Sequence, residues 1–202
     1  MKTDQSAVDK TSSAGRPRDR RIDAAVLSAA ADLLTEVGYA NVTMAAIAER
    51  AGTTKTALYR RWSSKAELVH EAAFPAAPTA LSMPEGDFAA DVRAMVAGAR
   101  DVFTSPPVRA ALPGLVADMS TDADLTARVR ERLHGLFDVV RVRIEHAVQR
   151  GEVHADVDPD RLIEIIGGAT LLRILMDPDS ELDDSWVHQT AAILTHGVRK
   201  AP

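Results

Sequence analysis

The chain contains no cysteine, which excludes disulfide bridges and thiolate chemistry. Aromatic residues make up only 4% of its 202 residues, and no apolar run approaches the ~20 residues that a membrane-spanning helix needs. The first residues lack the apolar segment of a signal peptide. These absences predict a cytoplasmic protein without a membrane partner.

Patterns typical of catalysis are missing as well. The sequence has no G-x-S-x-G, H-E-x-x-H or phosphate-loop motif. None of its six histidines stands beside a second ligand at metal-binding spacing on one helical turn. We therefore expect no metal, no cofactor and no enzyme. Catalysis stays as an alternative, which turnover without residues 1–73 would favour.

Apolar residues recur at helical spacing along most of the chain. They make up 46% of the sequence, and alanine, which favours helices, is abundant. Steps of three and four separate the apolar residues between about Asp19 and Val37, where Gly38 can stop the helix. Ser64 and Asp158 are expected to cap later helices, and Pro113 to kink or split one. With no strand pattern, the sequence predicts an all-α fold of about nine helices.

Composition divides the chain into four segments. The first is polar and lacks a helical period, and the third, "FPAAPTALSMPEG", contains three prolines. We expect a disordered arm at 1–17, a small helical domain (the head) at 18–73, a linker at 74–86 and a larger helical domain (the body) at 87–202.

Charge is distributed unevenly along these segments. Residues 1–70 carry 11 Lys and Arg against 8 Asp and Glu, whereas residues 71–202 carry 13 against 21. A basic N-terminal part, arm and head together, on an acidic body suggests that this part binds a polyanion. The basic run "GRPRDRR" includes Arg18 and Arg20, which are expected to touch phosphates, although a solvated run is the alternative.

A helix, a glycine and a second helix follow one another between Met44 and Trp62, as in a helix-turn-helix. Small apolar residues let two helices cross closely, and Gly52 suits the tight turn between them. Short polar or basic side chains then occupy the first turn of the second helix, where they can meet DNA base edges. These are Thr53, Thr54, Lys55 and Thr56. The residues that suit phosphates are Tyr59, Arg60 and Lys65.

The alternatives differ in what the aromatic residues do. Tyr59 and Trp62 could be core residues, with Trp62 packed against the first helix, and Arg61 could be solvated. A helical adaptor that binds protein instead of DNA is a further alternative, and it predicts no salt-dependent DNA affinity.

The head resembles the N-terminal domain of the tetracycline repressor (TetR) family of transcriptional regulators. The resemblance covers residues 19–73 and rests on "AAVLSAAADLLTEVGYANVTMAAIAERAGTTKTALYRRWSSKAELV". Within it, "GYANVTMAAIAERAG", "LYRRW" and "SSKAEL" are each typical of that family. The body matches more loosely, through "ALPGLVADM" and "RGEVHADVDPD".

The resemblance implies an all-α homodimer that binds a near-palindromic double-stranded DNA operator. Such proteins are usually repressors that a small-molecule effector releases from DNA, and a ligand-responsive activator is the alternative. Carried over to this chain, the resemblance places Thr43 on a phosphate. The sequence "YRRW" departs from the aromatic-His-Phe of many relatives, and Arg60 and Arg61 in it are expected to add phosphate contacts.

The segment Leu162–Met176 is apolar on more than one face, so it must be covered on two sides. One side can face a twofold mate, with the last helix completing a four-helix interface; a helix internal to its own domain is the alternative. The expected interface residues are Leu162, Ile166, Gly168, Ala169, Leu172, Leu175, Trp186 and Leu194.

An effector pocket is expected between the three helices at 88–103, 106–119 and 122–150. Its effector is of unknown identity. The candidate lining residues are Met95, Phe103, Leu115, Met119, His134, Phe137 and Arg141.

Overall fold

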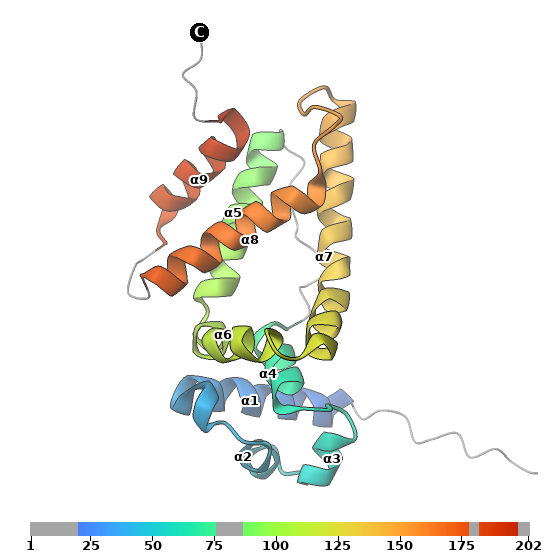
Figure 1. The fold of residues 1–202 in the computed structure, drawn as a ribbon, viewed down its shortest axis with the longest axis vertical. Coiled ribbons are helices and arrows are strands. Elements are labelled where there is room, and N and C mark those ends of the chain that lie inside the picture. The colour runs from blue at the N-terminus through green and yellow to red at the C-terminus, as the bar shows by residue number, and fades with distance from the viewer. Residues whose placement is uncertain (1–19, 76–86, 178–181, 198–202) are drawn as a thin grey trace, which may run out of the picture.

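A computed structural model of the chain describes residues 20–75, 87–177 and 182–197. These ranges hold nine α-helices and no strand (Figure 1), which confirms the all-α expectation. The predicted arm at 1–17, Arg18 and linker residues 76–86 lie outside the described residues, as does the side chain of Arg20.

Four helices form the head: α1 (Arg20–Asn41), α2 (Met44–Arg50), α3 (Lys55–Tyr59) and α4 (Lys65–Ala73). Gly38 stops the first helical run of α1, as predicted. It interrupts the helix with a φ of 74°, after which helical structure resumes up to Asn41. Gly52 adopts a φ of 64° and turns the chain between α2 and α3, a conformation that costs glycine little. Ser64 caps α4 as predicted, since its Oγ accepts from the N–H of Glu67 at 3.1 Å.

The body contains α5 (Phe88–Thr104), α6 (Pro106–Met119), α7 (Ala123–Gln149), α8 (Pro159–Met176) and α9 (Asp184–His196). Asp158 caps α8, as expected. Of the kink or split expected at Pro113, the split is wrong, because α6 continues through this residue. Pro113 lies inside α6 on its exposed side.

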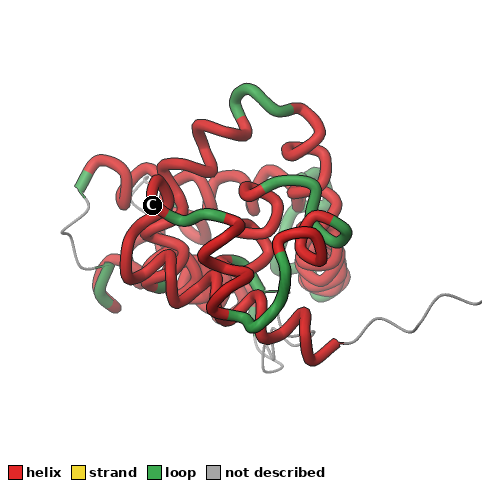
Figure 2. Tube along the Cα trace, turned by 90° about the horizontal axis from the view of Figure 1, so that it is seen from below, coloured by secondary structure: helices red, strands yellow, loops and turns green. Residues whose placement is uncertain are grey.

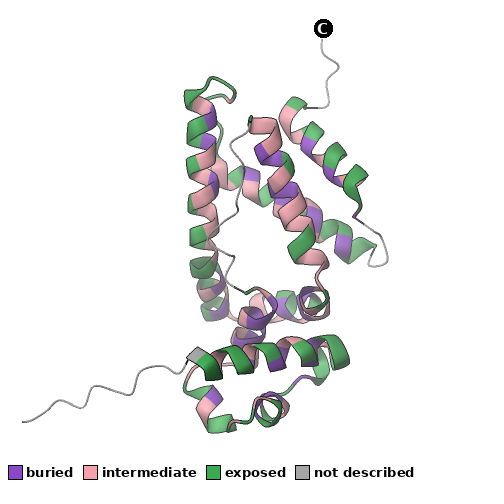
Figure 3. Ribbon diagram, turned by 180° about the vertical axis from the view of Figure 1, so that it is seen from behind, coloured by how far each residue is buried: buried purple, intermediate pink, exposed green. Residues whose placement is uncertain are grey.

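Two large apolar cores and a small third cluster of Leu112, Ile174 and Leu182 hold the described helices together (Figure 3). One core joins the head to the base of the body, because Val108, Leu115 and Leu125 pack with the buried residues of α1, α2 and α4. The other lies between α5, α7, α8 and α9 and includes Val92, Val96 and Ile144. Helix α1 packs on α4 and α6, so the head is seated directly on the body.

Candidate nucleic-acid interface

Helix α3 lies at the lower end of the molecule in Figure 1, the end from which Figure 2 views the chain. The Thr43 hydroxyl caps α2 by accepting from the N–H of Ala46 at 3.1 Å. Thr54 caps α3 in the same way, with the N–H of Ala57 at 3.2 Å. Both hydroxyl hydrogens remain available to donate outward, because each oxygen serves here as an acceptor.

Helix α3 buries one face and exposes the other. Leu58 has no exposed surface, whereas Tyr59 is 50% exposed. Besides Tyr59, four predicted DNA contacts lie on or beside this exposed face: Thr54, Lys55, Thr56 and Arg60. The Lys55 Nζ lies 5.9 Å from the centre of the Tyr59 ring, so the cation and the phenol share one side of the helix. Thr53, in the preceding turn, is half-buried.

The Lys65 side chain is half-buried and points back into the molecule. Its Nζ donates to the carbonyl of Tyr39 at 3.0 Å and lies 4.1 Å from the centre of the Tyr39 ring. The structure thus differs from the phosphate contact expected of Lys65, because fold-level packing supplies this ammonium group with partners that the local sequence does not reveal.

Arg61 and Trp62, which follow α3, connect the end of this helix to α1 and α4. Trp62 is only 3% exposed, and its Nε1 donates to a carboxylate oxygen of Glu71 on α4 at 2.8 Å. The alternative that Trp62 belongs to the core is therefore confirmed. Arg61 pairs with Asp23 of α1, with 2.6 Å between Nε and Oδ1, so it is not a solvated side chain.

Helix α6 packs on the head at Tyr39 of α1. The Tyr39 hydroxyl donates to Asp118, and the Tyr39 ring lies against Gly114 so closely that a Cβ there would overlap it. Burial, followed by the hydrogen bond to Asp118, raises the pKa of Tyr39 well above its usual range. The phenol therefore stays protonated and keeps donating.

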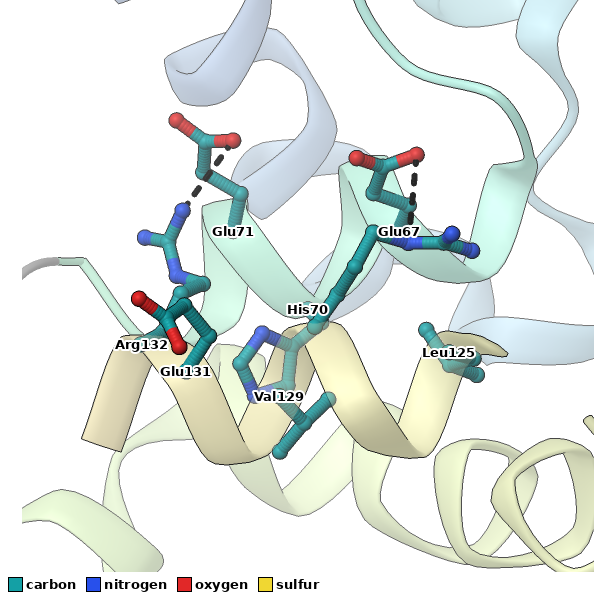
Figure 4. Close-up of a pocket in the computed structure, with 8 residues that line it drawn as sticks. Glu67, His70, Glu71, Leu125, Val129, Glu131 and Arg132 are labelled. Atoms are coloured by element: carbon teal, nitrogen blue, oxygen red, sulfur yellow. Dashed lines mark ion pairs between the residues drawn. The ribbon is translucent and has the colours of Figure 1, made fainter. Parts of the chain in front are cut away.

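A cavity of about 240 Å³ opens between α4 and α7 (Figure 4). Its walls combine apolar and charged side chains: Glu67, His70, Glu71, Leu125, Arg128, Val129, Glu131 and Arg132. His70 stacks on Phe74 with 5.0 Å between ring centres. Burial, together with the nearby Arg132 cation, lowers the pKa of His70 to about 4, against the opposing effect of Glu71.

The seven predicted effector contacts do not line this cavity, although three of them, Phe103, Leu115 and Met119, pack in the same apolar core. Met95 and Leu115 are buried in different cores, and Phe103, Met119 and Phe137 are partly buried. His134 is exposed on α7. Arg141 is held in a two-point ion pair with Asp160, at 3.0 and 2.9 Å.

The predicted dimer residues divide into two groups. Leu162 and Ile166 pack inside the chain's own core, so the expectation that they face a partner is wrong for these two. Leu172 and Leu175 are exposed, as is Gly168, while Ala169, Trp186 and Leu194 are partly buried. Periodicity places all of these on apolar faces, but it does not reveal which face the chain itself covers.

The sequence analysis did not predict the two ion pairs between α4 and α7 at the cavity, which we call the charged seam. Glu67 and Glu71 lie one turn apart on α4, and Arg128 and Arg132 lie one turn apart on α7. The matching i, i+4 spacings were the available signal.

The sequence analysis also did not predict Asp91, a carboxylate that is 2% exposed in α5 and has an unpartnered Oδ2. Burial raises the pKa of Asp91.

In the described ranges, no three His, Asp or Glu side chains are grouped so that they could hold a metal ion. Nor does any helix in the same part of the chain have the length and apolarity that crossing a membrane requires.

Comparisons with known proteins agree with this architecture. A family model described as "Bacterial regulatory proteins, tetR family" matches residues 26–72, and one described as "Tetracyclin repressor-like, C-terminal domain" matches residues 83–194. The chain is 31% identical to the HTH-type transcriptional regulator YdeS of Bacillus subtilis, over 92% of this chain and 93% of YdeS. It is 30% identical to the DNA-binding transcriptional repressor TetR of Mycobacteroides abscessus, over 81% of this chain and 86% of the repressor. The crystal structure of the TetR family transcription regulator SCO0332 superposes with a TM-score of 0.71 at 32% identity, covering 89% of this chain and all of SCO0332.

Proposed function

The chain belongs to the TetR family of transcriptional regulators, and on that premise we propose that it is a repressor that a small-molecule effector releases from a near-palindromic operator. The head at 18–73 binds DNA, and the body at 87–202 dimerises and binds the effector. The observation that carries the proposal is the exposed face of α3, which presents hydroxyls and cations at the end of the molecule.

Helix α3 is the recognition helix in this proposal. Thr53, Thr54, Lys55 and Thr56 meet base edges, because residues at the start of a recognition helix reach into the major groove. Tyr59 and Arg60, near the end of the helix, contact phosphates and set its register. Thr43 at the start of α2 adds a phosphate contact, and so do Arg18 and Arg20 from the arm. Lys65 is left out because Tyr39 engages its ammonium group.

A second copy of the chain covers the exposed apolar face of α8 and α9. Leu172 is 61% exposed, Met176 is 75% exposed, and Ile193 on α9 is 55% exposed. Exposed apolar residues gathered in this way are typical of an interface, and Gly168 on the same helix allows close approach of the partner. Two heads related by a twofold axis then read two half-sites about one helical turn apart, which explains a near-palindromic operator.

The effector acts by changing the separation of the two heads. We assign it to the body, where Phe103, Met119 and Phe137 remain as partly buried candidate contacts. Its binding moves α6 and α4, since both helices join the head to the body. An effector changes DNA affinity only as far as it binds the two states differently, so equal operator affinity with and without saturating effector would contradict this mechanism.

Selection of binding fragments from the source genome with the purified protein tests the DNA proposal. We expect a near-palindromic site whose affinity falls steeply with salt. Lys55→Ala should relax base preference at one position by about 1–3 kcal/mol, whereas Arg60→Ala should weaken all sequences alike and reduce the salt slope by about 1. Arg130→Ala, an exposed change on α7, is the matched control. No enrichment over random fragments, before or after refolding to remove bound effector, would refute DNA reading.

An activator is the second candidate for the same site. It would use the same α3 contacts, so the position of the selected operator relative to the promoter decides between the two. A site that overlaps the promoter supports repression, and an upstream site supports activation.

A further inference from the structure

The two carboxylates of α4 are each bonded to the segment that follows the recognition helix. Glu71 accepts from the Trp62 Nε1 at 2.8 Å. Glu67 accepts from both the N–H and the Oγ of Ser63, at 2.7 and 2.6 Å. The backbone N–H of Trp62 in turn donates to the carbonyl of Leu58 inside α3, at 2.9 Å. The orientation of α3 is therefore linked to the position of these carboxylates.

The same two carboxylates face two arginines of α7 across the cavity (Figure 4). Arg132 approaches Glu71 to 3.2 Å, and Arg128 approaches Glu67 to 3.8 Å. Both pairs are spaced one turn apart on their helices, so the two ion pairs are in register. An ionised carboxylate has about four acceptor positions, so it can serve the arginine and the Trp62–Ser63 segment at once.

Resting on the proposed DNA-reading function, we propose that Arg128 and Arg132 of α7 are positioning residues for operator recognition, which orient α3 through Glu67 and Glu71. Helix α7 thereby acts on the recognition helix through carboxylates that both elements share. This link is separate from the packing of α6 against Tyr39. Arg132 has the larger role because its ion pair is shorter. The Arg128 Nε is buried without a hydrogen-bond partner, so its link to Glu67 is electrostatic only.

The Trp62 indole reports on this link without any DNA. The chain has two tryptophans, so two indole N–H resonances are expected in a ¹⁵N-correlated NMR spectrum, and Trp62→Phe assigns them. Arg132→Gln should shift the Trp62 resonance, because Glu71 loses one of its two partners. Arg130→Gln removes the same charge from an exposed position on α7 and should leave that resonance in place. Equal spectra for the two variants would overturn the proposal, whatever the protein does with DNA.

Operator affinity gives the functional readout. Arg132→Gln should weaken operator binding about two- to fivefold relative to Arg130→Gln, the range expected for a partly exposed ion pair. Glu71→Gln keeps an acceptor for Trp62 but loses the charge. The variant that combines Arg132→Gln with Glu71→Gln should therefore bind the operator no more weakly than the weaker of the two single variants, as expected for residues that act together. Arg132→Lys, which keeps the charge, should restore most of the affinity.

The outcomes separate this inference from the proposed function. A shifted Trp62 resonance in a protein that selects no DNA would refute operator binding and leave the link to α3 supported. Operator binding that is equal in Arg132→Gln and Arg130→Gln would overturn the positioning role and leave the proposed function intact. If Arg132→Gln unfolds, Glu71→Gln, which removes the other charge of the same ion pair, is compared with Arg130→Gln instead, and equal operator binding would again overturn the positioning role.

Discussion

His70 shows how packing changes the chemistry of one side chain. The imidazole is 6% exposed, stacks on Phe74 and faces the charged seam between α4 and α7. Burial penalises its protonated form, and the Arg132 cation adds to that penalty. The folded protein therefore keeps His70 neutral at pH values where the unfolded chain protonates it.

This difference predicts acid sensitivity in a defined window. The pKa of His70 is about 4 in the folded state and 6.5 in its ordinary state, so the unfolded chain binds more protons between these values. The free energy of unfolding should be fully retained above pH 6.5 and fall as the pH drops towards 4. His70→Gln should reduce the fall in the free energy of unfolding between pH 6.5 and 4 by about 1–2 kcal/mol. The effect is smaller than the full pKa difference implies, because solvent in the cavity screens the charge.

Urea unfolding at several pH values measures the effect, and the NMR titration of the His70 ring locates its pKa directly. Identical pH dependence with and without the imidazole would contradict the argument.

The junction of α1 and α6 depends on a glycine that no turn requires. Gly114 lies within α6, where glycine disfavours the helix, and its missing side chain leaves room for the Tyr39 ring. Tyr39 then donates to Asp118, and its ring and carbonyl bind Lys65 of α4. Three helices thus meet at one aromatic ring.

Gly114→Ala should therefore destabilise the protein by about 1–3 kcal/mol, since the new methyl group overlaps the Tyr39 ring. Gly135→Ala is the matched control. It lies in α7 with nothing near the position of a Cβ, so higher helix propensity should stabilise the protein by up to about 1 kcal/mol. Chemical denaturation compares the two, and an equal gain from both would show that the ring does not need the space.

The proposed dimer would determine how two heads can read one operator. The α8 and α9 face leaves large apolar side chains exposed, among them Leu172 and Met176. In the single chain this surface stays in contact with water, whereas pairing with a second copy removes it.

Leu172→Glu should convert the proposed dimer into a monomer, because it would bury a charge in the proposed interface without a partner. Operator affinity should fall steeply as a result, since one head reads only one half-site. Val116→Glu places the same charge on an exposed position of α6 and should leave the dimer intact. Sedimentation equilibrium measures both, and an unaltered protein that is monomeric at micromolar concentration would reject the dimer.

Local signals were enough to predict the helices and the recognition motif. Ser64 and Asp158 cap helices where the sequence predicted, because a cap needs only residues three or fewer positions away. Gly52 turns between α2 and α3 for an equally local reason, the low cost of positive φ at glycine. The short polar and basic residues in the first turn of α3 likewise indicated its exposed side.

Tertiary structure alone decided which partner each side chain meets. Helical spacing places Lys65 on a surface but does not reveal that the Tyr39 carbonyl lies within its reach. It marks Leu162 as apolar but does not reveal that the chain's own core covers it. The pairing of Glu71 with Arg132 joins residues far apart in the sequence, so it exists only once α4 and α7 have packed. Period determines the face of a helix, whereas the packing of the helices determines what covers that face.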